Sequence, residues 1–142
     1  MNTKKFSKTL IGAALAYSIS FLSIAEVVVV VHPSNDAALD AKIVQRIFLG
    51  KEKKFSNGKE VLPINQVPSS AARDSFDTNT LGRSSTQIAA YWSKLVFTGK
   101  GIPPKELDND AAVLAIVADN PNAIGYVDSA SVSGAVKVIS LN

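Results

Sequence analysis

An uncharged apolar segment from Thr9 to Ala25 most limits what this chain can fold into. It follows Lys4, Lys5 and Lys8, and it ends in Ser23-Ile24-Ala25. A basic start, an apolar stretch and small residues before a cleavage point form the pattern of a secretory signal peptide. We therefore predict that residues 1–25 are a signal peptide cleaved after Ala25. A membrane anchor from Leu10 to Val31 is the alternative, but Glu26 would then lie in lipid, where a carboxylate is costly.

Removing this segment changes the charge of the protein. The whole chain carries a net charge of +3, and the three N-terminal lysines account for all of it. Residues 26–142 are formally neutral, so the composition gives no support for nucleic-acid binding, which needs a clustered positive face. The chain has no cysteine, which excludes disulfides. The remaining length suits one ordinary hydrophobic core, so we predict a single domain over residues 26–142.

Strand and helix patterns alternate along this domain. Val27–Val31 is an unbroken apolar run of β-branched residues, typical of a strand that is covered on both faces. Apolar spacing, serine or aspartate caps and turn residues predict the other elements. These are helices over 37–49, 69–79, 85–97 and 110–118, the last capped by Asp108 or Asp110, and strands over 61–65, 123–127 and 135–139. This order predicts an α/β layered fold with a parallel or mixed sheet.

Most catalytic motifs are absent from the sequence. His32 is the single histidine, lies at a strand end and is interpreted as structural. There is no phosphate-binding glycine loop and no dinucleotide fingerprint. Asp108-Asn109-Asp110 offers oxygen ligands without the spacing of a calcium loop, which favours a helix cap. We therefore predict no enzyme activity, no cofactor and no metal site.

One segment has the parts of an oxyanion pocket. Asn65–Phe76 joins a strand to a predicted helix start, where unpaired backbone N–H groups and the helix dipole favour an anion. Ser69 and Ser70 could add hydroxyl donors, and Arg73 could add a positive charge one turn later. The alternative interpretation is that the serines are ordinary helix caps.

Two further features have a structural and a functional interpretation. Lys51, Lys53, Lys54 and Lys59 form a basic stretch that is either a solvated loop or a contact for a membrane partner or a polyanion. Tyr91 and Trp92 lie in the amphipathic register of a helix, and we predict that they pack in the core rather than hold a ligand. Tyr126 follows Gly125 in an apolar strand and is predicted to be core as well.

Blocks of this sequence resemble part of the phosphate-binding proteins of phosphate ABC transporters, which are type II periplasmic binding proteins. The matching blocks are Ile47–Lys51, Asn57-Gly58, Pro63, the Ser69-Ser70 pair, Phe76, Trp92, Phe97–Gly101, Pro104 and Ala123–Val127. The resemblance extends over nearly all of residues 26–142. It implies one lobe of that fold, a three-layer αβα arrangement around a mixed central sheet.

The resemblance also implies a function and a site. The family's anion-binding arginine falls on Gln66, its Ser-Gly-Thr run falls on Ser70-Ala71-Ala72, and its following basic residue is Arg73. We therefore expect phosphate or a similar oxyanion to contact Gln66, Ser69, Ser70, Ala71, Ala72 and Arg73. The implied protein is periplasmic, and its implied partners are an ABC permease or a second subunit that completes the site.

The departures from the family pattern favour a second hypothesis. Gln66 replaces the arginine, Ala72 lacks the threonine hydroxyl, and residues 26–142 supply only one lobe. A fold can be retained after its site is lost. The alternative to a solute-binding protein is therefore an exported interaction or accessory protein that keeps the lobe fold without binding a ligand.

Overall fold

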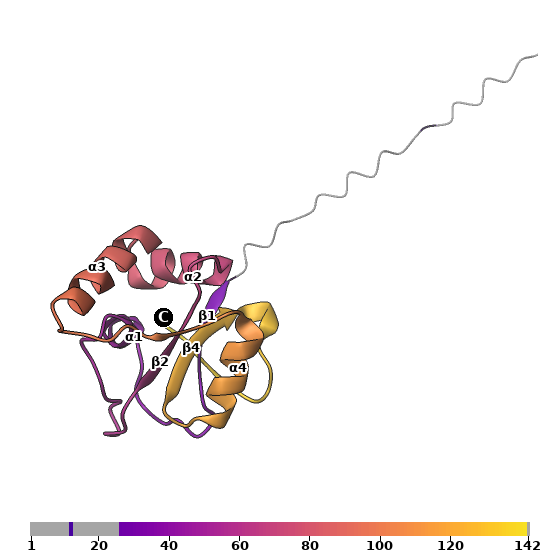
Figure 1. The fold of residues 1–142 in the computed structure, drawn as a ribbon. Helices are drawn as coiled ribbons and strands as arrows, with labels where there is room; N and C mark the ends of the chain where they lie inside the picture. Colours follow the sequence, from indigo (N-terminus) through magenta and orange to yellow (C-terminus); the bar gives the residue numbers. More distant parts are fainter. Residues whose placement is uncertain (1–11, 13–25, 142) are drawn as a thin grey trace, which may run out of the picture.

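The computed structural model describes Gly12 and residues 26–141, which form a five-stranded mixed sheet with helices on both faces (Figure 1). The predicted signal peptide and its cleavage point after Ala25 lie outside the described residues. Among the residues that are described, no helix is both long and apolar enough to cross a lipid bilayer.

The sheet has the strand order β3-β2-β4-β1-β5. Its strands are β1 (Val27–Val31), β2 (Leu62–Gln66), β3 (Lys105–Leu107), β4 (Ala123–Asp128) and β5 (Lys137–Ile139). Strand β2 runs parallel to both β3 and β4, whereas β1 is antiparallel to β4 and β5. The predicted mixed sheet is therefore confirmed, with the valine strand β1 in an inner position.

Helices form the two outer layers. The elements are α1 (Ala41–Phe48), α2 (Ala71–Phe76), a π-helical turn η1 (Asp77–Leu81), α3 (Ser85–Phe97), α4 (Asp110–Asp119) and a short 3-10 turn η2 (Ser129–Ser131). The side chains of α1, α2, η1 and α3 pack with Val29, Val31 and Tyr126 on one face of the sheet. Helix α4 packs with Val30 and Val127 on the other face. This is the three-layer αβα arrangement that the resemblance implies.

An aromatic group occupies the centre of the larger core. The rings of Phe76 and Tyr126 stack with centroids 3.9 Å apart, and the edge of Phe48 packs against Phe76 at 4.8 Å. Burial raises the pKa of Tyr126, so its hydroxyl stays protonated. Trp92 is also buried, and its indole nitrogen has no hydrogen-bond partner in the part of the chain that the structure describes. Tyr126 and Trp92 are therefore core residues, as their register predicts.

Several element boundaries differ from the sequence-based prediction. Helix α1 begins at Ala41 rather than Ala37, because the Asp40 carboxylate accepts a hydrogen bond from the Ile43 amide and caps the helix there. Asn109, and not Asp108 or Asp110, caps α4 through the amide of Ala112. The predicted helix over 69–79 is divided into α2 and η1, and the last strand begins at 137 rather than 135.

Strand β3 has no counterpart in the prediction. It has three residues, begins directly after Pro103-Pro104, and contains Lys105 and Glu106, so it has neither the length nor the apolar pattern of a strand. It is an edge strand that pairs with β2 alone. Short, charged edge strands are typical of sheets that avoid pairing with other chains.

Candidate functional site

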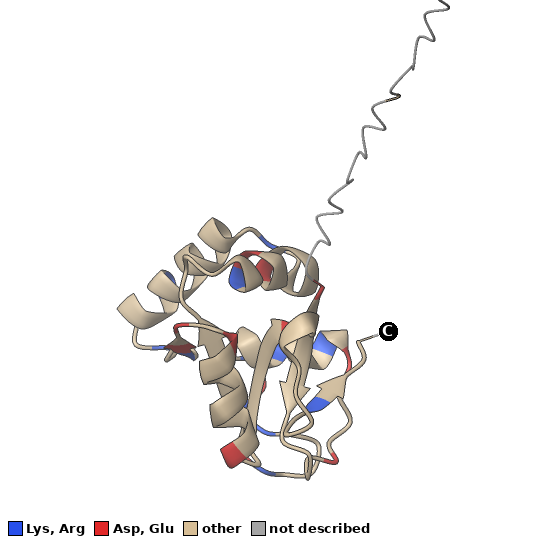
Figure 2. Cartoon of the chain, turned by 90° about the vertical axis from the view of Figure 1, so that its right-hand side faces the viewer, with Lys and Arg blue, Asp and Glu red and all other residues tan. Residues whose placement is uncertain are grey.

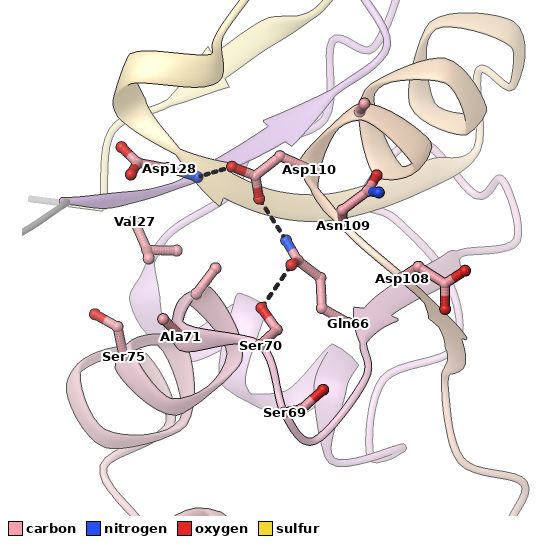
Figure 3. Close-up of a pocket in the computed structure, with 12 residues that line it drawn as sticks. Val27, Gln66, Ser69, Ser70, Ala71, Ser75, Asp108, Asn109, Asp110 and Asp128 are labelled. Atoms are coloured by element: carbon pink, nitrogen blue, oxygen red, sulfur yellow. Dashed lines mark hydrogen bonds between the residues drawn. The ribbon is translucent and has the colours of Figure 1, made fainter.

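A cavity of about 620 Å³ lies at the edge of the sheet where the parallel strands β2 and β3 end (Figure 3). In sheets of this kind, ligands bind outside the carboxyl ends of the parallel strands. Its lining comes from the β2–α2 turn, the β3–α4 turn and the adjacent ends of β1 and β4. The lining residues are Val27, Gln66, Ser69, Ser70, Ala71, Ala72, Ser75, Asp108, Asn109, Asp110, Ala111 and Asp128.

Two helices begin at this cavity. Ser70 caps α2 by accepting a hydrogen bond from the Arg73 amide at 3.3 Å, and Asn109 caps α4 in the same way. The first amides of each helix have no acceptor within the helix, and they carry the positive end of its dipole. Ala71, Ala72 and Ala111 line the cavity with no side chain beyond Cβ. A ligand can therefore approach the backbone closely at both helix starts.

Gln66 connects the elements around the cavity. Its buried amide nitrogen donates to Oδ1 of Asp110 at 2.8 Å and to the carbonyl of Tyr126 at 3.0 Å. Its Oε1 accepts a hydrogen bond from the Ser70 hydroxyl at 2.7 Å. Figure 3 shows this side chain between the start of α2 and the start of α4. Both N–H donors of the amide are used within the protein and its oxygen accepts from Ser70, so Gln66 fixes the wall of the cavity.

The cavity lining is acidic. It contains the carboxylates of Asp108, Asp110 and Asp128, and it contains no lysine, arginine or histidine. Asp110 is internally compensated, because its Oδ2 accepts from the Asp128 amide at 3.1 Å and from the Ser131 hydroxyl at 2.7 Å. Over the ribbon as a whole, acidic and basic residues are interspersed (Figure 2). Among the described residues, no cluster of three His, Asp or Glu side chains is arranged to hold a metal ion.

Arg73 lies outside this cavity. Its side chain is only 7% exposed, and its Nη1 donates to the carbonyl of Gln66 and to Oε1 of Glu106, both at 2.9 Å. Its Nε lies 3.6 Å from Oδ2 of the fully buried Asp77. Burial raises the pKa of Asp77, although the Ser85 hydroxyl and the Arg73 guanidinium oppose this shift. Arg73 therefore compensates two carboxylates on the other side of α2.

The structure thus brings five of the six predicted site residues together. One cavity is lined by Gln66, Ser69, Ser70, Ala71 and Ala72. Arg73 points elsewhere because it pairs with Asp77, four residues later, and with Glu106 on the distant strand β3. Sequence reasoning missed Asp110 and Asp128 as cavity residues. For Asp128 the available signal was its position at the end of an apolar strand, whereas Asp110 follows β3, which the sequence does not reveal.

Solved structures with this fold include phosphate-binding proteins. A phosphate transport receptor of the ABC type from Vibrio cholerae has a TM-score of 0.63 at 18% identity, over 80% of this chain and 44% of that one. A second solved structure is of a phosphate ABC transporter substrate-binding protein with bound phosphate from Clostridium perfringens. It has a TM-score of 0.64 at 18% identity, over 80% of this chain and 43% of that one. PstS from Borrelia burgdorferi has a TM-score of 0.60 at 12% identity, over 80% of this chain and 46% of that one.

No family model and no curated protein matches the sequence. The chain spans less than half the length of the solved proteins it resembles. The fold is therefore that of part of a phosphate ABC transporter substrate-binding protein, as the resemblance implies.

Proposed function

We propose that the protein is a solute-binding module for phosphate or a similar oxyanion. The observation that carries this proposal is the convergence of two helix starts, α2 and α4, on one cavity at the carboxyl ends of parallel strands. Backbone amides at such positions are anion donors that do not depend on side chains. The fold shared with phosphate-binding proteins supports the same choice of ligand class.

The acidic lining narrows the choice of anion. A fully ionised tetrahedral anion such as sulfate would place its oxygens against the carboxylates of Asp108, Asp110 and Asp128 and would be repelled. Hydrogen phosphate also accepts hydrogen bonds from amides, and its P–OH group can donate one to a carboxylate. We therefore expect phosphate to bind in preference to sulfate.

A proline substitution at the start of α2, with phosphate affinity measured by calorimetry, tests this site. Ala71 is the first residue of α2, where proline fits the helix and removes one N–H donor. Ala71→Pro should weaken phosphate binding by roughly tenfold or more, since a hydrogen bond to a charged group contributes about 1.5–3 kcal/mol. Ala41→Pro at the first position of α1 is the matched control, because that helix start does not line the cavity. Equal affinities in the two variants would contradict the proposed site.

A second candidate function is supported by the charges. The cavity lining holds three carboxylates and no cation, and Arg73 is already paired with acidic residues of the protein. These charges favour an exported interaction protein that no longer binds anions. This alternative predicts no heat on titration with millimolar phosphate, where binding would be weaker than about −4 kcal/mol. Saturable phosphate binding would exclude it.

We also propose that the protein is exported to the periplasm, with an ABC permease or a second subunit as its partner. Export predicts that the protein recovered from the periplasmic fraction begins at Glu26. Intact-mass measurement of that fraction would test the cleavage point, and recovery of the full-length chain in the membrane fraction would support the anchor instead.

A further inference from the structure

A second surface of the molecule combines lysines with exposed apolar side chains. It surrounds a hollow of about 780 Å³ between the last turn of α1 and the last turn of α3. Lys51, Lys53 and Lys100 line the hollow with Ile102, and Phe97 lines an adjoining groove that shares Trp92. We call these five residues, Lys51, Lys53, Phe97, Lys100 and Ile102, the basic apolar surface.

The three lysines of this surface are not neutralised by acids. No aspartate or glutamate lines the hollow. Among the described residues, none of these lysines forms a salt bridge, and the neighbouring Glu52 pairs with Arg46 at 3.7 Å. Three unpaired ammonium groups around one hollow provide charge complementarity to an anionic surface.

Two apolar side chains stand out from the same surface. Phe97 and Ile102 are each 91% exposed, the highest values among the exposed large apolar residues of the described chain. Phe97 ends α3, and Ile102 follows the turn through Gly99, Lys100 and Gly101. Phe97 adjoins Val96, which is 52% exposed, and both line the adjoining groove with Pro103 and Pro104. This arrangement suits shallow insertion into a lipid layer, with lysines at the level of the headgroups.

The helix ends argue against a small anion held inside the hollow. Both α1 and α3 end here, so their terminal carbonyl groups present the negative end of the helix dipole. A free phosphate in the hollow would be repelled by these carbonyls, whereas the exposed lysine heads can reach an extended layer of phosphates. The geometry therefore favours a lipid surface over a soluble anion.

We propose that the basic apolar surface docks the protein on membranes that contain anionic phospholipids, with Phe97 and Ile102 inserted and Lys51, Lys53 and Lys100 against the headgroup phosphates. This goes beyond the proposed function, because the surface is separate from the cavity lined by Gln66 and the helix starts. A failure of one proposal leaves the other standing.

Vesicle sedimentation with the purified protein tests this docking. Vesicles of phosphatidylglycerol and phosphatidylcholine should bind the protein, and vesicles of phosphatidylcholine alone should not. Each lysine near an anionic membrane accounts for about fivefold in binding, so replacing all three by glutamine should reduce binding on the order of 100-fold. Phe97→Ser should also reduce binding. Val138→Ser is the control and should leave vesicle binding unchanged. Val138 is an exposed apolar residue on β5, the sheet edge opposite β3.

Other outcomes would overturn the proposal. Absence of binding to anionic vesicles would do so, and so would binding that the lysine and Phe97 variants leave unchanged. Displacement of the protein from vesicles by millimolar inorganic phosphate would identify a small-anion site. Vesicle binding that falls in the lysine variant but is equal in the wild type and in Phe97→Ser would identify a purely electrostatic polyanion surface without insertion. Circular dichroism of each variant checks that a loss of binding does not come from unfolding.

Discussion

Replacing Arg73 by alanine should destabilise the fold more than any exposed charge change. The Arg73 side chain is 7% exposed, and it is the cation nearest to the fully buried Asp77. Its removal leaves the Asp77 carboxylate in the interior with the Ser85 hydroxyl as its remaining donor, while Oδ1 of Asp77 already has no partner. The carbonyl of Gln66 loses a donor as well.

The size of the effect follows from this burial. Removing one partner of a buried ion pair costs about 3–5 kcal/mol, because the remaining charge is uncompensated. The pair with Glu106 adds little, because that carboxylate is 43% exposed and water screens it. For a urea m-value of about 1.5 kcal/mol/M, the unfolding midpoint should fall by roughly 2–3 M.

Equilibrium unfolding in urea, followed by Trp92 fluorescence, measures this loss. Arg46→Ala is the control, because Arg46 forms an exposed pair that contributes at most about 1 kcal/mol. The double variant Arg73→Met with Asp77→Leu should recover most of the stability, since no charge is left buried. A loss below about 1 kcal/mol in Arg73→Ala would refute this account of the pair. If the double variant folds but no longer binds phosphate, the predicted ligand role of Arg73 is supported instead.

Three further predictions concern packing and pH. Gly50 has φ +71°, and a Cβ there would lie 2.8 Å from the Trp92 ring. Gly50→Ala should therefore lower the free energy of unfolding by about 2–4 kcal/mol, measured by thermal or urea unfolding. An unchanged stability would contradict the contact. A Cβ on Gly125 would lie 2.6 Å from Val113 Cγ1, so Gly125→Ala should lower the free energy of unfolding by about 1–3 kcal/mol. Adding Val113→Ala should partly restore it, and additive losses of stability in the double variant would exclude a direct contact. Burial raises the pKa of Asp77 above its unfolded value of 3.8, so the folded state binds the extra proton and the stability from this group is lost as pH rises through the folded pKa. The free energy of unfolding of the wild type minus that of Asp77→Asn should therefore fall as pH rises from 3, and a rising difference in urea titrations would refute the direction.

Much of the fold was accessible from the sequence because local patterns and tertiary packing agree. The valines of β1 need cover on both faces, and Val29, Val30 and Val31 are buried while Val27 and Val28 are half-buried. The apolar stripe of α3 and its Ser84 cap specify that helix directly, and the capping box with Gln87 is present. Strand β3 could not be predicted in this way, because three residues with two charges form a strand only where β2 offers an edge.

The site was predictable in its backbone and not in its charges. A serine-capped helix start after a strand is a local feature, so Ser69 and Ser70 are predictable from the residues, and the family resemblance adds Ala71 and Ala72. The direction of the Arg73 side chain depends on Asp77 and Glu106. Glu106 lies 33 residues away on β3, a strand that the sequence does not predict. Side-chain pairing between distant segments leaves no periodic signal in a single sequence.

The position of β1 in the sheet has a kinetic consequence. Its partners are β4 and β5, so the first strand of the domain can pair only after residues 123–128 and 137–139 are available. Contacts between such distant segments make folding slow, because loop closure precedes the gain from pairing. During synthesis, Val27–Val31 is therefore an unpaired, β-prone, uncharged segment of the kind that starts aggregation. The rate at which β4 and β5 arrive, rather than the stability of the finished sheet, sets how long this segment stays exposed.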